Sequence, residues 1–497
     1  MKRTITALLL IAMLLGTIAS CGEKTTPDST VTPTADTETE VETATEEETE
    51  MQPDIPALDF GGETFTCLTS GEADDNGADW VTYDVWVESL TGDAINDAVY
   101  NRNAYLMETY NIVLAEIQST GTTQSQTQKD VQSGGGEYDL VFTNITAGCN
   151  LAQNGCLLSL YDMPYIDLSK PWWDQKAVED LSLLGNLYFA TGDITVIDND
   201  ATWVLMFNKE MHKDHGLDDL YTLVRENRWY YDNFYEMIQT AAMDTNGDGK
   251  MHGPDDTFGF ATSDYSSYGL LYASGELFTT RDADKKPVLI SDVDRLSRVA
   301  EAAGKIMSDT DRTVITGKQG IVGSDNLRFV FEEGRALFFG EVMQCITRMR
   351  DSETAFGLIP WPKFDESQQD YCTLIHTTAG KGIVIPATQT DMEMAGAIVE
   401  AMAAKSMYTL TPAYYDVALT YKYMRDNESA EMLDIILDSR CFDLGLIYNW
   451  GSLTSSIHSI VTNGKTDNFA STWEKCVDKF NTALAKTMTA YEELQNR

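Results

Sequence analysis

Three strand-like runs separated by helix-like segments constrain the fold of this chain most strongly. Residues 62–69 alternate polar and apolar side chains and run into Ser70 and Gly71, and residues 111–114 and 136–142 form two further apolar runs. Such runs are typical of β-strands bounded by turns. Between the first two runs, apolar side chains recur at helical spacing at Ile95, Val99, Leu106 and Tyr110. Strands that alternate with helices predict a parallel α/β sheet, in which ligands bind beyond the carboxyl ends of the strands.

The remainder of the chain continues this alternation. We expect strands at residues 187–190, 203–207, 336–339 and 378–386, and helices at residues 229–243, 392–405, 428–437 and 472–494. The chain has 497 residues, whereas a single hydrophobic core stops growing at roughly 250 to 300 residues. The sequence therefore predicts an α/β protein with two lobes.

The beginning of the chain has the layout of an export signal. Lys2 and Arg3 precede an apolar run at residues 5–15, which is too short for a membrane span of about 20 residues. Residues 18–21, Ile-Ala-Ser-Cys, resemble the lipobox of bacterial lipoproteins, in which the cysteine is lipid-modified and becomes the new N-terminus. We expect a signal peptide at residues 1–20 and a lipid-modified Cys21. The alternative is an ordinary signal peptide that happens to end near a cysteine.

Residues 21–56 are rich in Thr, Glu and Pro and contain hardly any large apolar side chain. Such a segment cannot bury enough apolar surface to offset its conformational entropy, so we expect a disordered acidic tether. Over the whole chain, 78 acidic residues against 35 basic residues give a formal net charge of -43. A surface of this sign repels phosphate backbones, which argues against a nucleic acid partner. Uncharged sugars, cations and many peptides are compatible with it.

The chain has eight cysteines, and those beyond Cys21 lack CxxC spacing. Neither a disulfide framework nor a zinc site is therefore indicated. Most of these cysteines are expected to be small core residues, although Cys149 and Cys156 are near enough in sequence to close a loop.

Short motifs occur in order along most of the chain, at residues 93–103, 137–140, 154–160, 164–173, 207–209, 331–338 and 357–363. Together they resemble the extracellular solute-binding lipoproteins of bacterial ABC importers, in particular the carbohydrate-binding, family 1-like group. The resemblance implies the two-lobe, type II fold of periplasmic binding proteins, with a hinge between the lobes. By similarity, lobe 1 comprises residues 57–144 and 376–410, and lobe 2 comprises residues 145–375 and 411–497.

The resemblance also implies a function. The protein is expected to capture a carbohydrate, an oligosaccharide, in the cleft between the lobes and to deliver it to the permease subunits of an ABC transporter. It is expected to be a monomer that is lipid-anchored on the extracellular face of the cell membrane. Closure of the lobes around the ligand would be the functional motion.

Residues 244–255 contain the ligand pattern of an EF-hand calcium loop. Oxygen-bearing side chains stand at loop positions one, three, five and twelve, with a glycine at position six for the sharp turn. The expected metal-site residues are Asp244, Asn246, Asp248, Lys250, His252 and Asp255. Asp255 replaces the usual glutamate at position twelve, so the loop departs from the pattern at its closing ligand. We expect bound calcium with a structural role, and the alternative is an acidic turn without metal.

Aromatic side chains beside polar groups are the candidate ligand contacts, because an aromatic ring stacks on the apolar face of a pyranose while carboxylates bind its hydroxyls. Near predicted strand ends and turns, the residues that fit are Trp172, Trp203, Glu341 and Trp361. Comparison with maltodextrin-type binding proteins implies further contacts from Asp264, Tyr265 and Tyr268, and Trp450 resembles their late tryptophan contact. The alternative is that most of these aromatics pack in the core.

Catalytic motifs are mostly missing from the sequence, which has no GxSxG, no HExxH and no P-loop. Carboxylates are so abundant that no pair stands out as the acid and base of a glycoside hydrolase. We therefore expect a binding protein and not an enzyme. Two alternatives stay open: a surface lipoprotein glycoside hydrolase, and a binding protein for a peptide or another nonsugar solute.

Overall fold

The computed structural model describes residues 50–74, 77–420 and 427–495. The expected signal peptide, Cys21 and most of the expected tether lie outside these residues. Within the described ranges, no helix combines the length and the apolar character that a membrane crossing needs. Glu50–Arg497 group into one unit by their contacts, and the following description applies to that unit.

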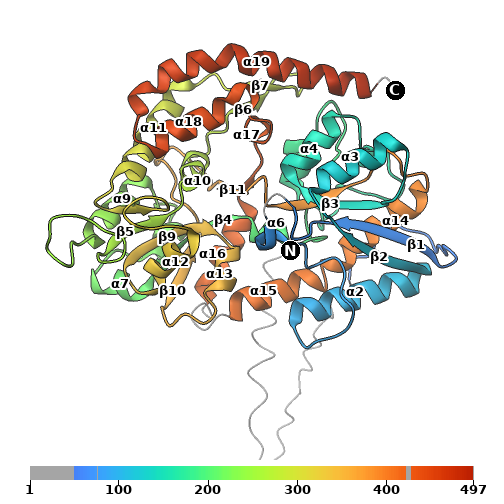
Figure 1. The fold of residues 1–497 in the computed structure, drawn as a ribbon, viewed down its shortest axis with the longest axis horizontal. Helices are drawn as coiled ribbons and strands as arrows, with labels where there is room; N and C mark the ends of the chain where they lie inside the picture. The colour runs from blue at the N-terminus through green and yellow to red at the C-terminus, as the bar shows by residue number, and fades with distance from the viewer. Residues whose placement is uncertain (1–49, 75–76, 421–426, 496–497) are drawn as a thin grey trace, which may run out of the picture. The chain divides into compact units, whose positions relative to one another are not determined.

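Lobe 1 is the part of the unit that is built on a four-stranded sheet (Figure 1). In spatial order its strands are β12 (Lys381–Val384), β3 (Leu140–Asn144), β1 (Glu63–Thr69) and β2 (Ile112–Gln118). β1 pairs in parallel with β2 and β3, as the sequence predicts, whereas β12 pairs antiparallel with β3. β12 differs because it enters the sheet on the return from lobe 2, not through a local helical crossover.

The helices of lobe 1 begin at side-chain caps. Asp93 accepts a hydrogen bond from the backbone N–H of Asn96 at 2.9 Å, which starts α2 (Ala94–Tyr110). Asn144 caps α4 (Ile145–Gln153) in the same way, through the backbone N–H of Ala147 at 2.8 Å. α4 packs on β3 and β12. The chain therefore stays with lobe 1 beyond Asn144, where the resemblance implied that it leaves.

Lobe 2 is built on a five-stranded mixed sheet. In spatial order its strands are β10 (Phe356–Ile359), β4 (Trp203–Asn208), β9 (Ala336–Val342), β5 (Phe258–Thr262) and β8 (Thr313–Ile315). β4 pairs antiparallel with β9 and β10, and β5 pairs in parallel with β8 and β9. The predicted strands at residues 203–207 and 336–339 are thus confirmed. The strand predicted at residues 187–190 is wrong, because only an isolated bridge between Ala190 and Ile383 forms there.

The two lobes are joined by segments that run side by side. In residues 190–202 and 375–383, Ala190 donates its backbone N–H to the Ile383 carbonyl at 3.2 Å, and His376 donates its backbone N–H to the Ala201 carbonyl at 2.8 Å. A third segment passes between the lobes at β13 (Arg440–Cys441), which pairs in parallel with β11 (Thr373–Leu374). These are the crossing segments, and they are the natural place for a hinge.

The C-terminal helix α19 (Phe469–Leu494) runs across both lobes (Figure 1). It packs against α18 (Leu453–Thr462) on the side of lobe 2 and against α4 on the side of lobe 1. Its interior face is apolar, with Phe469, Trp473, Phe480 and Tyr491 buried. The predicted helix at residues 472–494 is confirmed and begins slightly earlier than expected.

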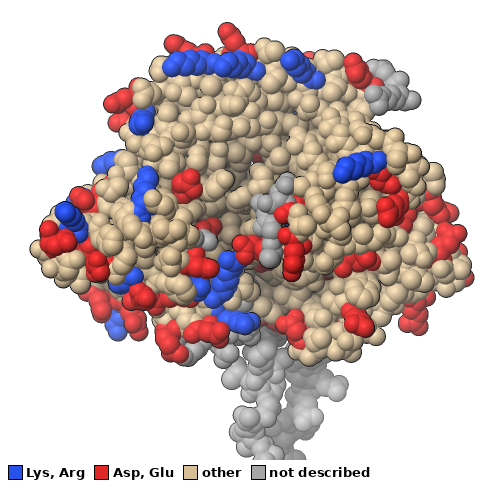
Figure 2. Space-filling model, viewed as in Figure 1, with Lys and Arg blue, Asp and Glu red and all other residues tan. Residues whose placement is uncertain are grey.

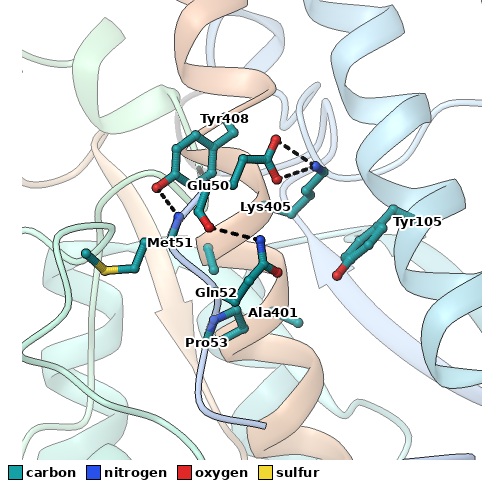
Figure 3. Close-up of a pocket in the computed structure, with 9 residues that line it drawn as sticks. Glu50, Met51, Gln52, Pro53, Tyr105, Ala401, Lys405 and Tyr408 are labelled. Carbon is teal, nitrogen blue, oxygen red and sulfur yellow. Dashed lines mark hydrogen bonds and ion pairs between the residues drawn. The ribbon is translucent and has the colours of Figure 1, made fainter. Parts of the chain in front are cut away.

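Residues 50–62 lie on lobe 1 before the first strand. The Lys405 ammonium contacts both carboxylate oxygens of Glu50, at 2.9 and 3.1 Å, and the backbone N–H of Met51 donates to the Tyr408 hydroxyl at 2.8 Å (Figure 3). Both partners belong to the end of α14 (Met392–Ser406) and the turn after it. Ile55 packs partly buried against the core. The packed part of the chain therefore starts before residue 57, where the expected tether would end.

Candidate functional site

Six aromatic rings from both lobes and from one crossing segment meet in a chain of ring contacts, which we call the aromatic cluster. Its members are Trp80 of η2 (Gly77–Trp80), Trp203 at the start of β4, Tyr265 and Tyr268 at the start of α10 (Ser266–Ala273), His376, and His458 of α18. Lobe 1 contributes Trp80, and lobe 2 contributes both tyrosines, Trp203 and His458. The cluster therefore lies between the lobes.

His376 is the centre of one half of the aromatic cluster. Its ring is stacked on the Trp203 ring, with centroids 6.1 Å apart and planes 12° apart. The Tyr265 ring lies 5.7 Å from it and the Trp80 ring lies 6.4 Å from it. Because His376 belongs to a crossing segment and Trp80 to lobe 1, a change in the angle between the lobes would alter these distances.

Tyr268 and His458 form the other half. Their rings are stacked with centroids 4.1 Å apart, and Tyr265 joins the two halves because it lies 5.9 Å from His458 and 5.7 Å from His376. Tyr265 is 52% exposed. Its ring is therefore the part of the aromatic cluster with most surface free to contact a ligand.

His376 is held in its neutral form. Burial lowers the pKa of His376 to about 4, because the charged imidazolium is poorly solvated among the rings. The Thr378 hydroxyl lies 3.2 Å from His376 Nδ1. A neutral imidazole has one donor and one acceptor nitrogen, so it can exchange hydrogen bonds with hydroxyl groups.

Two carboxylates lie near this region of the sheet. Glu341, near the end of β9, pairs with Val204 across the sheet, so its side chain projects on the face opposite to Trp203. Partial burial raises the pKa of Glu341 to about 7, while Arg348 lowers it and the Asp264 carboxylate raises it further. Asp264 is exposed and directly precedes Tyr265. The structure thus gathers Trp203, Tyr265 and Tyr268 with the adjacent Asp264, four of the residues that the sequence singled out, whereas ligand contact by Glu341 stays a prediction.

Buried charges hold the crossing segments together. The Arg440 guanidinium bridges the carboxylates of Asp174 at 2.6 Å and Asp198 at 3.0 Å. Asp200 accepts hydrogen bonds from the hydroxyls of Tyr83 at 2.7 Å and Tyr414 at 3.0 Å. Burial raises the pKa of Asp198 to about 7 and that of Asp200 to about 6.

Two predicted ligand contacts, Trp172 and Trp361, lie in the core. Trp172 is fully buried in lobe 1, and its neighbour Trp173 donates its indole N–H to Glu400 at 3.0 Å. Trp361 is 1% exposed, and its ring packs directly against the backbone of Gly340. A side chain at residue 340 would collide with it, because a Cβ atom there would lie 2.6 Å from the ring. The predicted ligand contact is not supported for either residue, because neither indole has a face to offer.

Trp450 is also placed away from the aromatic cluster. Its ring is stacked on Tyr448 with centroids 5.0 Å apart, and its indole N–H donates to the Thr487 hydroxyl at 2.9 Å. These contacts fasten α19 to the segment before α18. Trp450 is 3% exposed. Its buried ring stabilises the C-terminal helix in this structure and has little free surface to offer, so ligand contact by Trp450 is not supported.

The acidic loop at residues 244–255 wraps around its own backbone. Asp244 accepts hydrogen bonds from the backbone N–H groups of Gly247 at 2.7 Å and Gly249 at 2.8 Å. Asp248 accepts one from Lys250 at 2.9 Å. The fully buried Asp256 holds the far end of the loop, by accepting from the backbone N–H groups of Thr245 and His252.

The expected metal ligands of this loop do not all face one another. The Asp255 carboxylate lies 3.0 Å from His252 Nδ1, so these two residues pair at the surface. Among the residues that the structure describes, no three His, Cys, Asp or Glu side chains converge on one point. The oxygens of Asp244, Asn246 and Asp248 suit a hard cation in kind. Calcium binding at this loop stays a prediction.

Sequence reasoning did not identify Trp80, His376 or His458. Trp80 follows a predicted strand end but lies in a polar stretch without regular spacing. His376 and His458 carry no local motif, and their role in the aromatic cluster comes from contacts between distant segments. Cys149 and Cys156, considered as a loop closure, are both free thiols.

The face that carries the hollow is mixed in charge. Figure 2 shows that this face is hollowed between the two lobes beneath α19, and that acidic side chains lie along the lower rim of the hollow as well as on the outer flanks. Ring faces, a neutral imidazole and neighbouring carboxylates can together stack on apolar surfaces and accept hydrogen bonds.

Comparisons with known proteins give matches in structure only. A scan of protein-family models and a search of curated protein sequences find no match. RafE from Streptococcus pneumoniae in its apo form is similar with a TM-score of 0.55 and 12% identity, covering 85% of this chain and 98% of that one.

Two further solved structures were determined with sugars. A cyclo/maltodextrin-binding protein complexed with maltotetraose has a TM-score of 0.54 and 14% identity, covering 87% of this chain and 97% of that one. The ABC substrate-binding protein Lmo0181 from Listeria monocytogenes, in complex with cycloalternan, has a TM-score of 0.51 and 12% identity, covering 88% and 99%. At such identities the likeness establishes the fold alone: this chain has the two-lobe, type II fold of periplasmic binding proteins.

Proposed function

We propose that this chain is a solute-binding receptor of an ABC importer and holds a neutral oligosaccharide between its lobes. The observation that carries the proposal is the aromatic cluster, which combines rings from both lobes and a crossing segment in one place. Such a cluster is complete only when the lobes are close together. It therefore supports a receptor that closes around its ligand.

The chemistry of the aromatic cluster favours a sugar over other solutes. Tyr265 and Tyr268 offer ring faces for stacking, and Asp264 and Glu341 offer acceptors for hydroxyl groups. His376 is neutral at physiological pH and adds no positive charge for an acidic ligand. The carboxylates would repel an anion, so the ligand is expected to be uncharged or cationic. The sugar complexes of two proteins with the same fold favour the uncharged choice.

Binding would couple to closure through the crossing segments. A ligand that contacts Tyr265 on lobe 2 and Trp80 on lobe 1 has more contacts in the closed form than in the open form. It therefore shifts the population toward the closed form by the difference in affinity. No chemical step on the ligand is needed for this mechanism, and the proposal is a receptor without catalytic activity.

The proposal includes an anchor and a place in the cell. Cys21 would carry the lipid, and the acidic segment after it would tether the domain outside the cell membrane, close to the permease subunits. A flexible chain of this length has a root-mean-square reach of roughly 30 Å. The tether would raise the effective concentration of the receptor near its transporter. The protein would act as a monomer.

We also infer that the loop at residues 244–255 binds calcium with a structural role. Asp244, Asn246 and Asp248 supply oxygens at the spacing of a calcium loop, and Asp256 holds the end of the loop in place of Asp255. Calcium would add cross-links to a surface loop without touching the ligand. The loop belongs to lobe 2, in the connection between α9 (Tyr231–Ala241) and β5.

The test is a calorimetric and thermal-shift screen of the purified soluble domain against neutral oligosaccharides, including maltotetraose and cycloalternan, and against peptides. We expect micromolar or tighter binding of at least one glycan and no binding of peptides. Incubation with the bound glycan, followed by chromatography, should return the glycan intact. Binding of peptides alone, or appearance of shorter products, would contradict the proposal.

A further inference from the structure

We infer that Arg348 and Gln344 of lobe 2 are positioning residues that hold Trp80 of lobe 1 in the aromatic cluster. They do so by binding Asp79, the residue before Trp80. This inference rests on the proposed function, because it names the residues that complete the ligand site when the lobes are together. None of the three residues that form this contact was singled out by the sequence.

The contact joins the two lobes directly. Arg348 Nη2 lies 2.6 Å from Asp79 Oδ1, and Gln344 Nε2 donates to the backbone carbonyl of Asp79. Arg348 Nη2 also donates to Gln344 Oε1 at 3.2 Å, so the two side chains act as one unit. Both belong to α13 (Gln344–Arg348), the short helix directly after β9. We call these three residues the interlobe clasp.

The base of the segment that carries Asp79 is fixed to lobe 1. The backbone N–H of Ser70, just after β1, donates to the Thr82 hydroxyl at 3.1 Å, and the Thr82 N–H donates to the Ser70 carbonyl at 2.9 Å. Asp79 and Trp80 lie inside this tied segment and reach lobe 2. Two bonds to Asp79, one to its side chain and one to its carbonyl, restrict the backbone from which the Trp80 ring projects.

Trp80 is the residue of lobe 1 that makes a ring contact in the aromatic cluster. Its ring lies 6.4 Å from His376 at an angle of 36°, and the residue is half-buried. Among the described residues, Trp80 is the only ring that lobe 1 contributes to the aromatic cluster. Loss of the bonds to Asp79 would therefore let this ring move. The interlobe clasp would then act on ligand affinity without touching the ligand.

The clasp is weak enough to open. The Arg348 and Asp79 side chains are 30% and 63% exposed, and ion pairs of this kind contribute roughly 0.2 to 1 kcal/mol. Such a contact can bias the closed form without locking it. We expect its loss to weaken glycan binding by about 1.4- to 5-fold, which is the fold-change that this energy range corresponds to.

The test uses the soluble domain labelled with 5-fluorotryptophan, with the Trp80 fluorine resonance assigned from Trp80→Phe. Asp79→Asn is the main variant, because it removes the ion pair but leaves the charge of Arg348, which also lowers the pKa of Glu341. Gln344→Ala removes the second bond. Arg350→Ala is the matched control, since Arg350 is 73% exposed and, within the described part of the chain, forms an ion pair only with its neighbour Asp351 at 3.6 Å.

In the ligand-free protein, Asp79→Asn and Gln344→Ala should each move the Trp80 resonance and increase its shift between H₂O and D₂O, which reports solvent contact. Arg350→Ala should leave it unchanged. An unmoved Trp80 resonance in both clasp variants would overturn the inference. Maltotetraose is the binding probe, and its Kd should rise about 1.4- to 5-fold in Asp79→Asn. If maltotetraose fails to bind the unaltered protein, the proposed function loses support, while the fluorine result still decides the role of the clasp.

Discussion

Replacement of Tyr265 by alanine should weaken ligand binding without unfolding the protein. Tyr265 is 52% exposed, and a fully covered aromatic side chain buries roughly 150 to 250 Å², so a stacked ligand would remove about 80 to 130 Å² of this ring from water. At about 25 cal/mol per Å², this area corresponds to about 2 to 3 kcal/mol. Alanine keeps the Cβ atom and association has its own entropic cost, so we expect roughly 10- to 100-fold weaker binding.

The assay is isothermal titration of the glycan that binds tightest in the screen. Tyr161→Ala is the matched control, because Tyr161 is 49% exposed on lobe 1 and its hydroxyl lies 3.3 Å from Ser182, outside the aromatic cluster. Thermal unfolding of both variants should stay close to that of the unaltered protein. Equal Kd values for Tyr265→Ala and the unaltered protein would refute the placement of the ligand at the cluster.

Further predictions concern calcium binding, the pH dependence of stability, the ion pairs of the crossing segments and the packing of the C-terminal helix. Calcium should raise the Tm of the protein, and EGTA should reverse this increase. In Asp244→Ala the increase should be absent. The same Tm with calcium and with EGTA would count against calcium binding. The pKa of His376 is lowered in the folded state to about 4, so the folded state takes up fewer protons than the unfolded state below pH 6.5 and stability falls as the pH drops. The free energy of unfolding of the unaltered protein should therefore fall relative to that of His376→Asn between pH 7 and pH 5, by at most roughly 2 kcal/mol. Urea titrations of both proteins at the two pH values measure this difference. Arg440→Met should destabilise by about 3 to 5 kcal/mol, because it leaves two buried carboxylates without their cation. Trp450→Ala should lower the free energy of unfolding by about 3 to 5 kcal/mol with little change in Kd, and a large loss of affinity at unchanged stability would restore it to the ligand site.

Local pattern was sufficient for most of the elements. The alternation at residues 62–69 and the spacing of Val99, Leu106 and Tyr110 predicted β1 and α2, because period and capping depend on neighbours in the chain. The strand predicted at residues 187–190 is wrong, because a short apolar run is equally typical of a buried segment that makes one bridge to a distant strand. The exit from lobe 1 was also placed too early, because the packing of α4 on β3 and β12 is a long-range contact.

The sequence by itself determined the fold class, the expectation of two lobes and the chemical kind of the site residues, because these follow from composition, periodicity and the residue types at strand ends. Only the tertiary structure decided which aromatic residues share one site. Trp203 and Trp361 look alike as sequence positions, yet one stacks on His376 between the lobes and the other fills the space beside Gly340 in the core. The aromatic cluster joins residues from 80 to 458 along the chain, and contacts over such separations depend on how the lobes pack, which no local spacing records.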